Sequence, residues 1–205
     1  TRGKAPNSHD IIKTDLLENA NLSPQEANEF SRQWSEHEAR LSGSGFDDLL
    51  TQIQSLHSRR NKKGGTEFRK AVIGRYSGGA KEFLETALPA YVDAYVTIST
   101  GKGEFGNLTG KITEALNHLR LIDHQLWRAP ALKFLVNHNG SPEIAHRFFS
   151  NLERFAFAAM MAGVDNRELA YANAIEVTRE GMECGFVPNF VTPEGYFSRD
   201  RSQPP

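Results

Sequence analysis

The sequence contains a single cysteine, Cys184, among its 205 residues. A single cysteine excludes an internal disulfide framework, and no pair of cysteines is present that could hold a zinc ion. Proteins that depend on disulfides for stability belong to oxidising compartments, so this composition favours a reducing one. We therefore expect a cytoplasmic protein.

Long hydrophobic runs are also missing. The longest apolar stretches, such as residues 155–162, fall far short of the roughly 20 residues that a membrane-spanning helix requires. The formal net charge is only -1, which gives no general attraction to nucleic acid or to membrane surfaces. The hydrophobic content of 39%, with 13 phenylalanines, is enough for a real core. We expect a folded protein without a membrane partner.

The usual sequence signatures of enzymes are absent as well. The stretch Gly101-Lys102-Gly103 lacks the spacing of a phosphate-binding glycine loop. The stretch 42–45, Ser-Gly-Ser-Gly, resembles a nucleophile elbow only superficially, because no strand precedes it. We therefore predict no catalytic residue, no metal site and no cofactor site within this chain.

Histidines offer a weaker alternative. His118 and His124 lie six residues apart, and Asp123 precedes the second, so a small α-helical enzyme that uses Asp123 and His124 is conceivable. A spacing of six does not bring two side chains to one helix face, whereas three, four or seven would. We favour a structural role at the end of a helix, where a histidine offsets the helix dipole.

Two other histidines precede an acidic residue, in His9-Asp10 and His37-Glu38. Neither pair is near another residue in the sequence that would complete a catalytic group. We expect both pairs to lie on the solvated surface.

What the sequence does contain is a succession of helix signals. In Ser23-Pro24-Gln25-Glu26, serine is a good N-cap, proline suits the first helical position and glutamate completes a capping box. Ser8 is a candidate N-cap for an earlier helix, with Asp10 in its first turn. Apolar residues then recur every three or four positions, and no segment alternates at period two.

We therefore predict an all-α fold, an irregular bundle of about eight helices followed by a non-helical C-terminal arm. Pro89 should kink or restart one helix, and Gly43-Ser44-Gly45 should end another. The remaining helices are expected at about 46–56, 67–73, 80–95, 108–123, 131–136, 142–163 (the longest) and 166–183, and the arm at 186–205.

Charge is distributed unevenly along the chain. The segment from residue 59 to residue 81 has eight basic residues and one acid, Glu67, which gives a formal charge of +7. Presented on one face, this charge would contact several phosphates of duplex DNA, whereas the alternative is a solvated, mobile loop. The DNA-binding candidates are Arg59, Arg60, Lys62, Lys63, Arg69, Lys70, Arg75 and Lys81.

Several short motifs follow one another in an order that resembles one protein family. They are Arg2-Gly3, Ser8-x-Asp10-Ile11-Ile12-Lys13-x-x-Leu16-Leu17, Trp34-x-x-x-Glu38, Leu119-Arg120-x-Ile122, Trp127-Arg128-Ala129-Pro130-Ala131-Leu132 and Leu152-Glu153-Arg154-Phe155-Ala156-Phe157. This order, over most of residues 1 to 185, is similar to the helical region that follows the ParB-like N-terminal domain in GmrSD-type, modification-dependent (type IV) restriction proteins. The Asp-Gly-Gln-Gln-Arg and His-Asn-His signatures of such proteins are absent here.

The resemblance implies that the chain is a piece of a longer protein. Residues 1–17 would be the tail of a nucleotide-handling domain and its junction helix, and residues 18–185 the helical domain. Arg2, Gly3, Asp10 and Lys13 would lie at the edge of the nucleotide site. The parent protein would be a nucleotide-dependent endonuclease using a nucleotide triphosphate and a divalent metal.

On this basis we expect a helical module of a phage-defence restriction protein that is not itself catalytic. Its partners would be the flanking domains of the same polypeptide, duplex DNA through the basic segment, and a second copy in a homodimer. The alternative is a protein-interaction or oligomerisation helical domain that does not bind nucleic acid.

Overall fold

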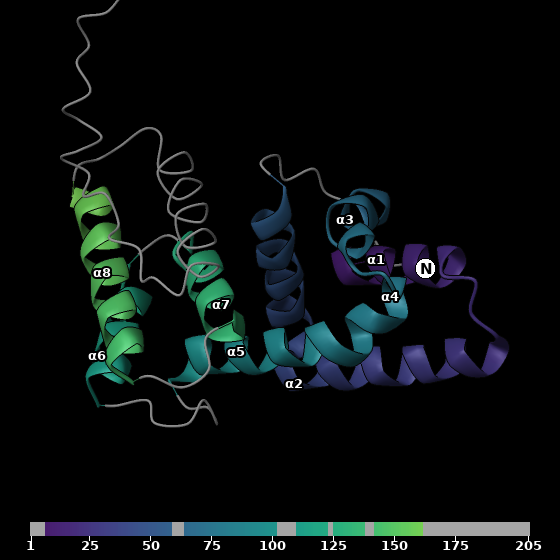
Figure 1. Ribbon diagram of the computed structural model, residues 1–205, viewed down its shortest axis with the longest axis horizontal. Coiled ribbons are helices and arrows are strands. Elements are labelled where there is room, and N and C mark those ends of the chain that lie inside the picture. The colour runs from purple at the N-terminus through teal and green to yellow at the C-terminus, as the bar shows by residue number, and fades with distance from the viewer. Residues whose placement is uncertain (1–6, 59–63, 102–109, 123–124, 138–141, 162–205) are drawn as a thin grey trace, which may run out of the picture. The chain divides into compact units, whose positions relative to one another are not determined.

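The computed structural model describes residues 7–58, 64–101, 110–122, 125–137 and 142–161, and in these ranges it contains helices and no strand (Figure 1). The predicted all-α class is confirmed. The elements are α1 (Ser8–Asn19), α2 (Pro24–His57), α3 (Gly65–Ala71), the 3-10 turn η1 (Ile73–Arg75), α4 (Gly79–Glu82), the π-helical turn η2 (Phe83–Ala87), α5 (Leu88–Thr100), α6 (Gly110–Arg120), α7 (Arg128–Asn137) and α8 (Pro142–Met161).

The chain divides into two compact units, one up to Val96 and one from Thr97 onward. Within the described ranges, no helix is both long and apolar enough to span a membrane. The predicted helix over 166–183 and the arm over 186–205 lie outside the described residues.

The N-cap of the first helix lies one residue earlier than predicted. Asn7 is the N-cap of α1 and Ser8 is its first helical residue, so the expectation of Ser8 as N-cap was wrong. The Asp10 carboxylate accepts a hydrogen bond from the Asn7 backbone N–H at 3.3 Å. The acid at the third helical position thus satisfies the backbone N–H of the N-cap residue, which has no partner within the helix.

The second helix, α2, is two helical arms joined at a bend. Its start is as predicted: Ser23 accepts from the Glu26 backbone N–H, and the Glu26 carboxylate accepts from that of Ser23. The bend is at Ser42, whose φ of 61° and ψ of 160° are not helical. In Figure 1 the first arm runs horizontally and the second rises from the bend. The helical conformation of the first arm therefore ends at Ser42, next to the predicted Gly43-Ser44-Gly45 stretch, and the second arm is the helix predicted over 46–56.

Two aromatic groups fill the interior of the first unit. Trp34, on the first arm of α2, stacks with Phe30 and meets Phe46 of the second arm edge-on at 5.1 Å. Phe68 of α3 meets Phe83 at 5.9 Å between ring centres. The second arm contributes the apolar positions that the sequence predicted, and all of them are buried: Phe46, Leu49, Leu50, Ile53 and Leu56.

The helix α3 approaches α1 closely at Gly65. A β-carbon there would lie 2.4 Å from the Asp15 β-carbon and 2.9 Å from the Ile11 carbonyl oxygen. Only a residue without a side chain fits at this distance. Gly65 therefore sets the spacing at which α3 rests on α1.

Pro89 deforms its helix as predicted, and the form of the deformation is a π-helical turn. Proline has no N–H and its ring clashes with the carbonyl four residues earlier, which is that of Glu85. The chain widens over Phe83–Ala87, and the Leu88 N–H donates to the Phe83 carbonyl. From α4 to the first part of α5 the chain runs along α2 in the same direction, with ion pairs Lys81–Glu26 and Arg40–Asp93.

The second unit is built from the end of α5 and from α6, α7 and α8. Its centre is a group of three rings: Phe134 stacks on Phe148 at 3.9 Å, and Phe149 meets both edge-on. The apolar positions predicted for α6, including Ile112, Leu116 and Leu119, are buried.

One detail of the prediction for this unit was wrong. The helix α7 begins at Arg128, although a turn was expected to Pro130, because proline is tolerated in the first turn of a helix where its missing N–H has no helical partner. The 20-residue α8 begins at Pro142 as predicted, and it is longer than either arm of the bent α2.

Candidate functional site

The structure describes half of the predicted DNA-binding residues. Arg59, Arg60, Lys62 and Lys63 lie outside the described residues. Arg69 donates to the Asp15 carboxylate of α1 at 2.9 Å, and Lys81 donates to the Glu26 carboxylate of α2 at 3.1 Å. These two cations therefore join helices within the first unit.

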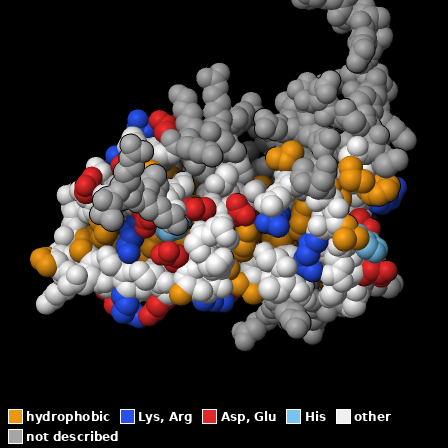
Figure 2. Space-filling view, turned by 180° about the vertical axis from the view of Figure 1, so that it is seen from behind, with side chains coloured by type: hydrophobic (Ala, Val, Ile, Leu, Met, Phe, Trp, Pro, Cys, Tyr) orange, Lys and Arg blue, Asp and Glu red, His pale blue; other side chains and the backbone are white. Residues whose placement is uncertain are grey.

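The other two described DNA-binding candidates, Arg75 and Lys70, have different surroundings. The Arg75 guanidinium donates to the backbone carbonyls of Ala71 and His57. Lys70 is exposed. In Figure 2 the coloured Lys and Arg side chains lie interspersed with Asp and Glu side chains, and they do not form a continuous basic surface on that face.

Two of the four residues predicted at the edge of a nucleotide site are also described, while Arg2 and Gly3 are not. Asp10 caps α1 through the Asn7 N–H, and its other carboxylate oxygen lies 3.7 Å from His9 Nε2. The Lys13 ammonium lies 3.4 Å from the Ser35 hydroxyl of α2. The nucleotide-site assignment stays a prediction.

The structure differs most clearly from the sequence-based expectation at His9. Its side chain is 1% exposed, so the expectation of a solvated His9-Asp10 pair was wrong for the histidine. The Asp47 carboxylate, on the second arm of α2, accepts from the His9 backbone N–H at 2.7 Å and contacts Nδ1 at 2.9 Å. Nε2 lies 3.1 Å from the Glu38 carboxylate on the first arm. The ring thus bridges the two arms beside the bend.

The chemistry of this group is structural. Ionised carboxylates only accept hydrogen bonds, so the ring donates to Glu38 and Asp47 at once when both of its nitrogens carry hydrogen. The His9 ring is buried, whereas the Glu38 and Asp47 side chains are partly exposed. Within the part of the chain that the structure describes, no three His, Cys, Asp or Glu side chains are grouped so as to bind a metal ion.

The remaining histidines with predicted roles are only partly described. His37 is half-buried, and burial together with the nearby Arg40 charge lowers its pKa. His118 Nδ1 lies 2.7 Å from the Glu153 carboxylate, which links α6 to α8. Asp123 and His124, the residues of the conceivable acid–base pair, lie outside the described residues.

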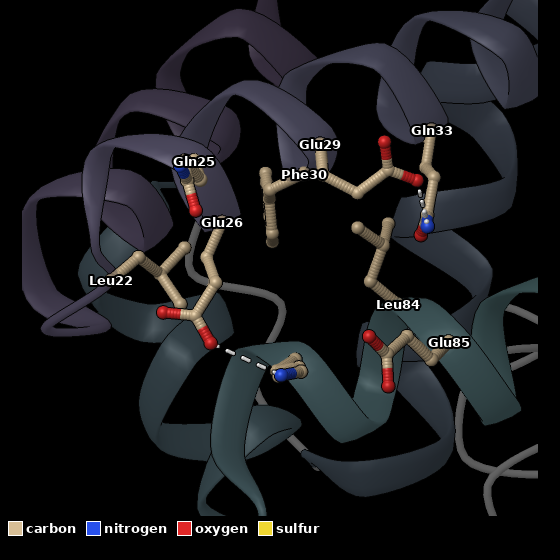
Figure 3. Close-up of a pocket in the computed structure, with 9 residues that line it drawn as sticks. Leu22, Gln25, Glu26, Glu29, Phe30, Gln33, Leu84 and Glu85 are labelled. Atoms are coloured by element: carbon tan, nitrogen blue, oxygen red, sulfur yellow. Dashed lines mark hydrogen bonds and ion pairs between the residues drawn. The ribbon is translucent and has the colours of Figure 1, made fainter.

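The first unit contains a pocket between the first arm of α2 and the chain from α4 into η2 (Figure 3). Its volume is about 270 Å³. Three apolar side chains line it, Leu22, Phe30 and Leu84, and the last two are almost completely buried. Polar side chains complete the lining: Gln25, Glu26, Glu29, Gln33, Lys81 and Glu85.

Hydrogen bonds hold two of the carboxylates at the pocket in the ionised form. The Ser23 backbone and hydroxyl, followed by Lys81, lower the pKa of Glu26 to about 2. Donation from Arg32 and Gln33 lowers the pKa of Glu29 to about 2. Both carboxylates are therefore negatively charged at neutral pH, and their positions are set by short-range partners on the same helix turn or on α4.

Comparisons with known proteins give no match for this chain: no family model, no curated protein and no solved structure matches it. Its function must therefore be inferred from its own residues.

Sequence patterns did not identify the pocket. Its residues come from the first turns of α2 and from a segment more than 50 positions later, and they meet because α4 and η2 run beside α2. One signal was present: Pro89 predicts a helix distortion, and π-helical turns are frequent at functional sites. Leu84 and Glu85 belong to that turn.

Proposed function

We propose that this chain is a helical interaction module, not an enzyme, and that it binds a protein partner through the pocket on α2, α4 and η2. The observation that carries the proposal is a pocket of about 270 Å³ with Phe30 and Leu84 at its base and polar side chains at its rim. Sites that bind partner side chains typically combine such an apolar base with a few fixed polar groups.

Photocrosslinking tests this proposal. A photoreactive residue replaces Gln25, at the pocket, or Glu18, an exposed position on α1 that does not line it. In native cells we expect one discrete crosslinked protein, identifiable by mass spectrometry, from position 25 only. The crosslink should disappear when Leu22→Trp fills the pocket. Equal crosslinking from positions 18 and 25, or no crosslink at all, would contradict the proposal.

The resemblance to GmrSD-type proteins supplies a context. In that context the module packs against other domains of a DNA restriction protein, and the partner protein is one of those domains or a second copy. We propose this as the setting of the interaction, on the strength of the ordered motifs between residues 1 and 185.

Contact with duplex DNA is a second candidate function, favoured by one observation. Residues 59–63 contain four basic side chains, and Lys70, in the following helix, is exposed. Because Arg69 and Lys81 are paired with acids of α1 and α2, we restrict the proposed contact to residues 59–63 and Lys70.

Salt-dependent binding tests the DNA contact. If four phosphates are contacted, affinity for a 25-base-pair duplex should fall roughly 100-fold between 50 and 200 mM salt. Charge reversal at Arg59, Arg60, Lys62 and Lys63 should remove this dependence, whereas reversal at Lys81 should leave it intact. An affinity that does not change on reversal of the four charges would reject DNA contact.

A further inference from the structure

The charge around the pocket on α2, α4 and η2 has one predominant sign. Three carboxylates line it, those of Glu26, Glu29 and Glu85, against one ammonium group, that of Lys81. The formal charge of the lining is therefore -2, from three negative charges and one positive charge. Lys81 lies 3.1 Å from Glu26, so these two charges offset each other.

The negative charge that remains belongs to Glu29 and Glu85. The Arg32 guanidinium donates to Glu29 from the same helix, and it is shared with Glu36, one turn further on. Glu85 is exposed and lies on η2, on the opposite side of the pocket from α2 (Figure 3). Carboxylates thus lie on both sides of an apolar floor.

The π-helical turn contributes both kinds of lining from one segment. Leu84 belongs to the buried floor, and the adjacent Glu85 is exposed at the rim. A wider helical turn changes the angle between successive side chains, and Pro89 follows two residues after the end of this turn. The apolar floor and the acidic rim are therefore consequences of the same backbone feature.

The size of the pocket limits what it accommodates. About 270 Å³ lies just under the range of roughly 300–1,000 Å³ that is typical of sites for drug-sized ligands. A single long side chain is a better match for this volume. Lysine and arginine lay their alkyl stems on apolar surface while the charged group stays at the polar edge.

We propose that the pocket receives one arginine or lysine side chain of the partner protein, with its stem on Phe30 and Leu84 and its cationic group between Glu29 and Glu85. This inference rests on the proposed function, because it names the chemistry of the partner. Charge complementarity selects the cation: an anionic side chain would meet two carboxylates, and Lys81 is already paired with Glu26.

Two peptides that differ in one charge test the inference by NMR titration. The first is acetyl-Ala-Leu-Arg-Leu-Ala-amide, and the second has citrulline, a neutral analogue of nearly the same shape, in place of arginine. We expect the arginine peptide to shift the amide resonances of Leu22, Gln25, Gln33 and Leu84 and to bind about five-fold more tightly, as partly exposed charge pairs allow.

Variants at exposed positions test whether the carboxylates at the rim of the pocket cause the preference for the arginine peptide. Glu29→Gln combined with Glu85→Gln should abolish the preference for arginine, and Glu18→Gln, which removes one negative charge on α1, should preserve it. Equal binding of the two peptides, a preference that survives the double variant, or shifts confined to residues away from the pocket would each overturn the inference.

The two proposals fail in different ways. A crosslinked partner at position 25 together with equal binding of the two peptides would contradict the proposed cationic side chain. The proposed interaction with a protein partner would remain supported. A clear preference for the arginine peptide without any crosslinked protein would support the chemistry of the pocket and reject the protein-partner function.

Discussion

Both units have aromatic interiors, but among the described residues the first unit has more charged pairs between helices than the second, where His118–Glu153 links α6 to α8. In the first unit, helices distant in sequence are joined by charged pairs: His9 with Glu38 and Asp47, Asp15 with Arg69, Glu26 with Lys81, and Arg40 with Asp93. In the described part of the second unit, the centre is the ring group of Phe134, Phe148 and Phe149.

The difference shows how each unit fixes the angles between its helices. Stacked rings stabilise through buried area and tolerate small rotations, whereas hydrogen bonds to a carboxylate weaken steeply when their geometry changes. Charged pairs of the first unit lie at the bend of α2 and beside the pocket. There the direction of a helix, as well as its burial, determines which residues meet.

The largest expected effect tests the aromatic ring group of the second unit. Phe148 is completely buried, so Phe148→Ala should lower the free energy of unfolding by roughly 3–5 kcal/mol. Hydrogen exchange measured by segment should show lost protection in α6, α7 and α8 and not in α1 to α3. Phe157→Ala, on the same helix but 55% exposed, is the control and should change stability by no more than about 0.5 kcal/mol. Equal loss in both units would mean that they unfold together.

A smaller effect tests the contacts between His9 and the carboxylates of α2 in the first unit. His9→Ala removes the ring contacts with Glu38 and Asp47, while Asp47 keeps the hydrogen bond from the backbone N–H of residue 9. This change should lower the free energy of unfolding by about 2 kcal/mol, measured by urea denaturation. His118→Ala is a matched control, since His118 also pairs with a carboxylate, at 2.7 Å, but is half exposed. Its loss should cost less than about 1 kcal/mol. Equal costs for the two histidines would show that burial of His9 adds nothing to its bonds.

The smallest effect concerns the bend itself, and its sign is opposite. Ser42 has a φ of 61° and a ψ of 160°, a conformation that is essentially restricted to glycine and costs other residues about 1–3 kcal/mol. Ser42→Gly should therefore raise the free energy of unfolding by about 1 kcal/mol. Ser44→Gly, two residues on and helical, should lower it by about 0.5–1 kcal/mol. Destabilisation by both glycines would mean that the bend is not strained at Ser42.

Local features of the fold were predictable because their causes are local. The capping box of Ser23 and Glu26 lies within four consecutive residues, and the apolar stripe from Phe46 to Leu56 follows helical periodicity. Pro89 indicated a distortion through its own ring. The form of that distortion, a π-helical turn, depends on how the chain packs along α2, so the sequence did not specify it.

The pocket and the His9 group could not be predicted in the same way. His9 and Asp47 are 38 positions apart, and they meet only because Ser42 redirects α2. In sequence, His9-Asp10 has the pattern of an ordinary exposed pair, and nothing in it indicates a carboxylate from each arm of another helix. Arg69 and Lys81 likewise counted toward a basic segment until the fold paired them with Asp15 and Glu26.

The sequence by itself therefore determined the helical class, the starts of α2 and α8 and many residues of the core, because capping and periodicity act over a few residues. Tertiary structure alone decided the partners of the charged residues. Whether a lysine or arginine is available for DNA, or a glutamate for a cation, depends on which helix lies beside it. Which helices lie side by side follows from the bend at Ser42, the close contact at Gly65 and the turn before Pro89.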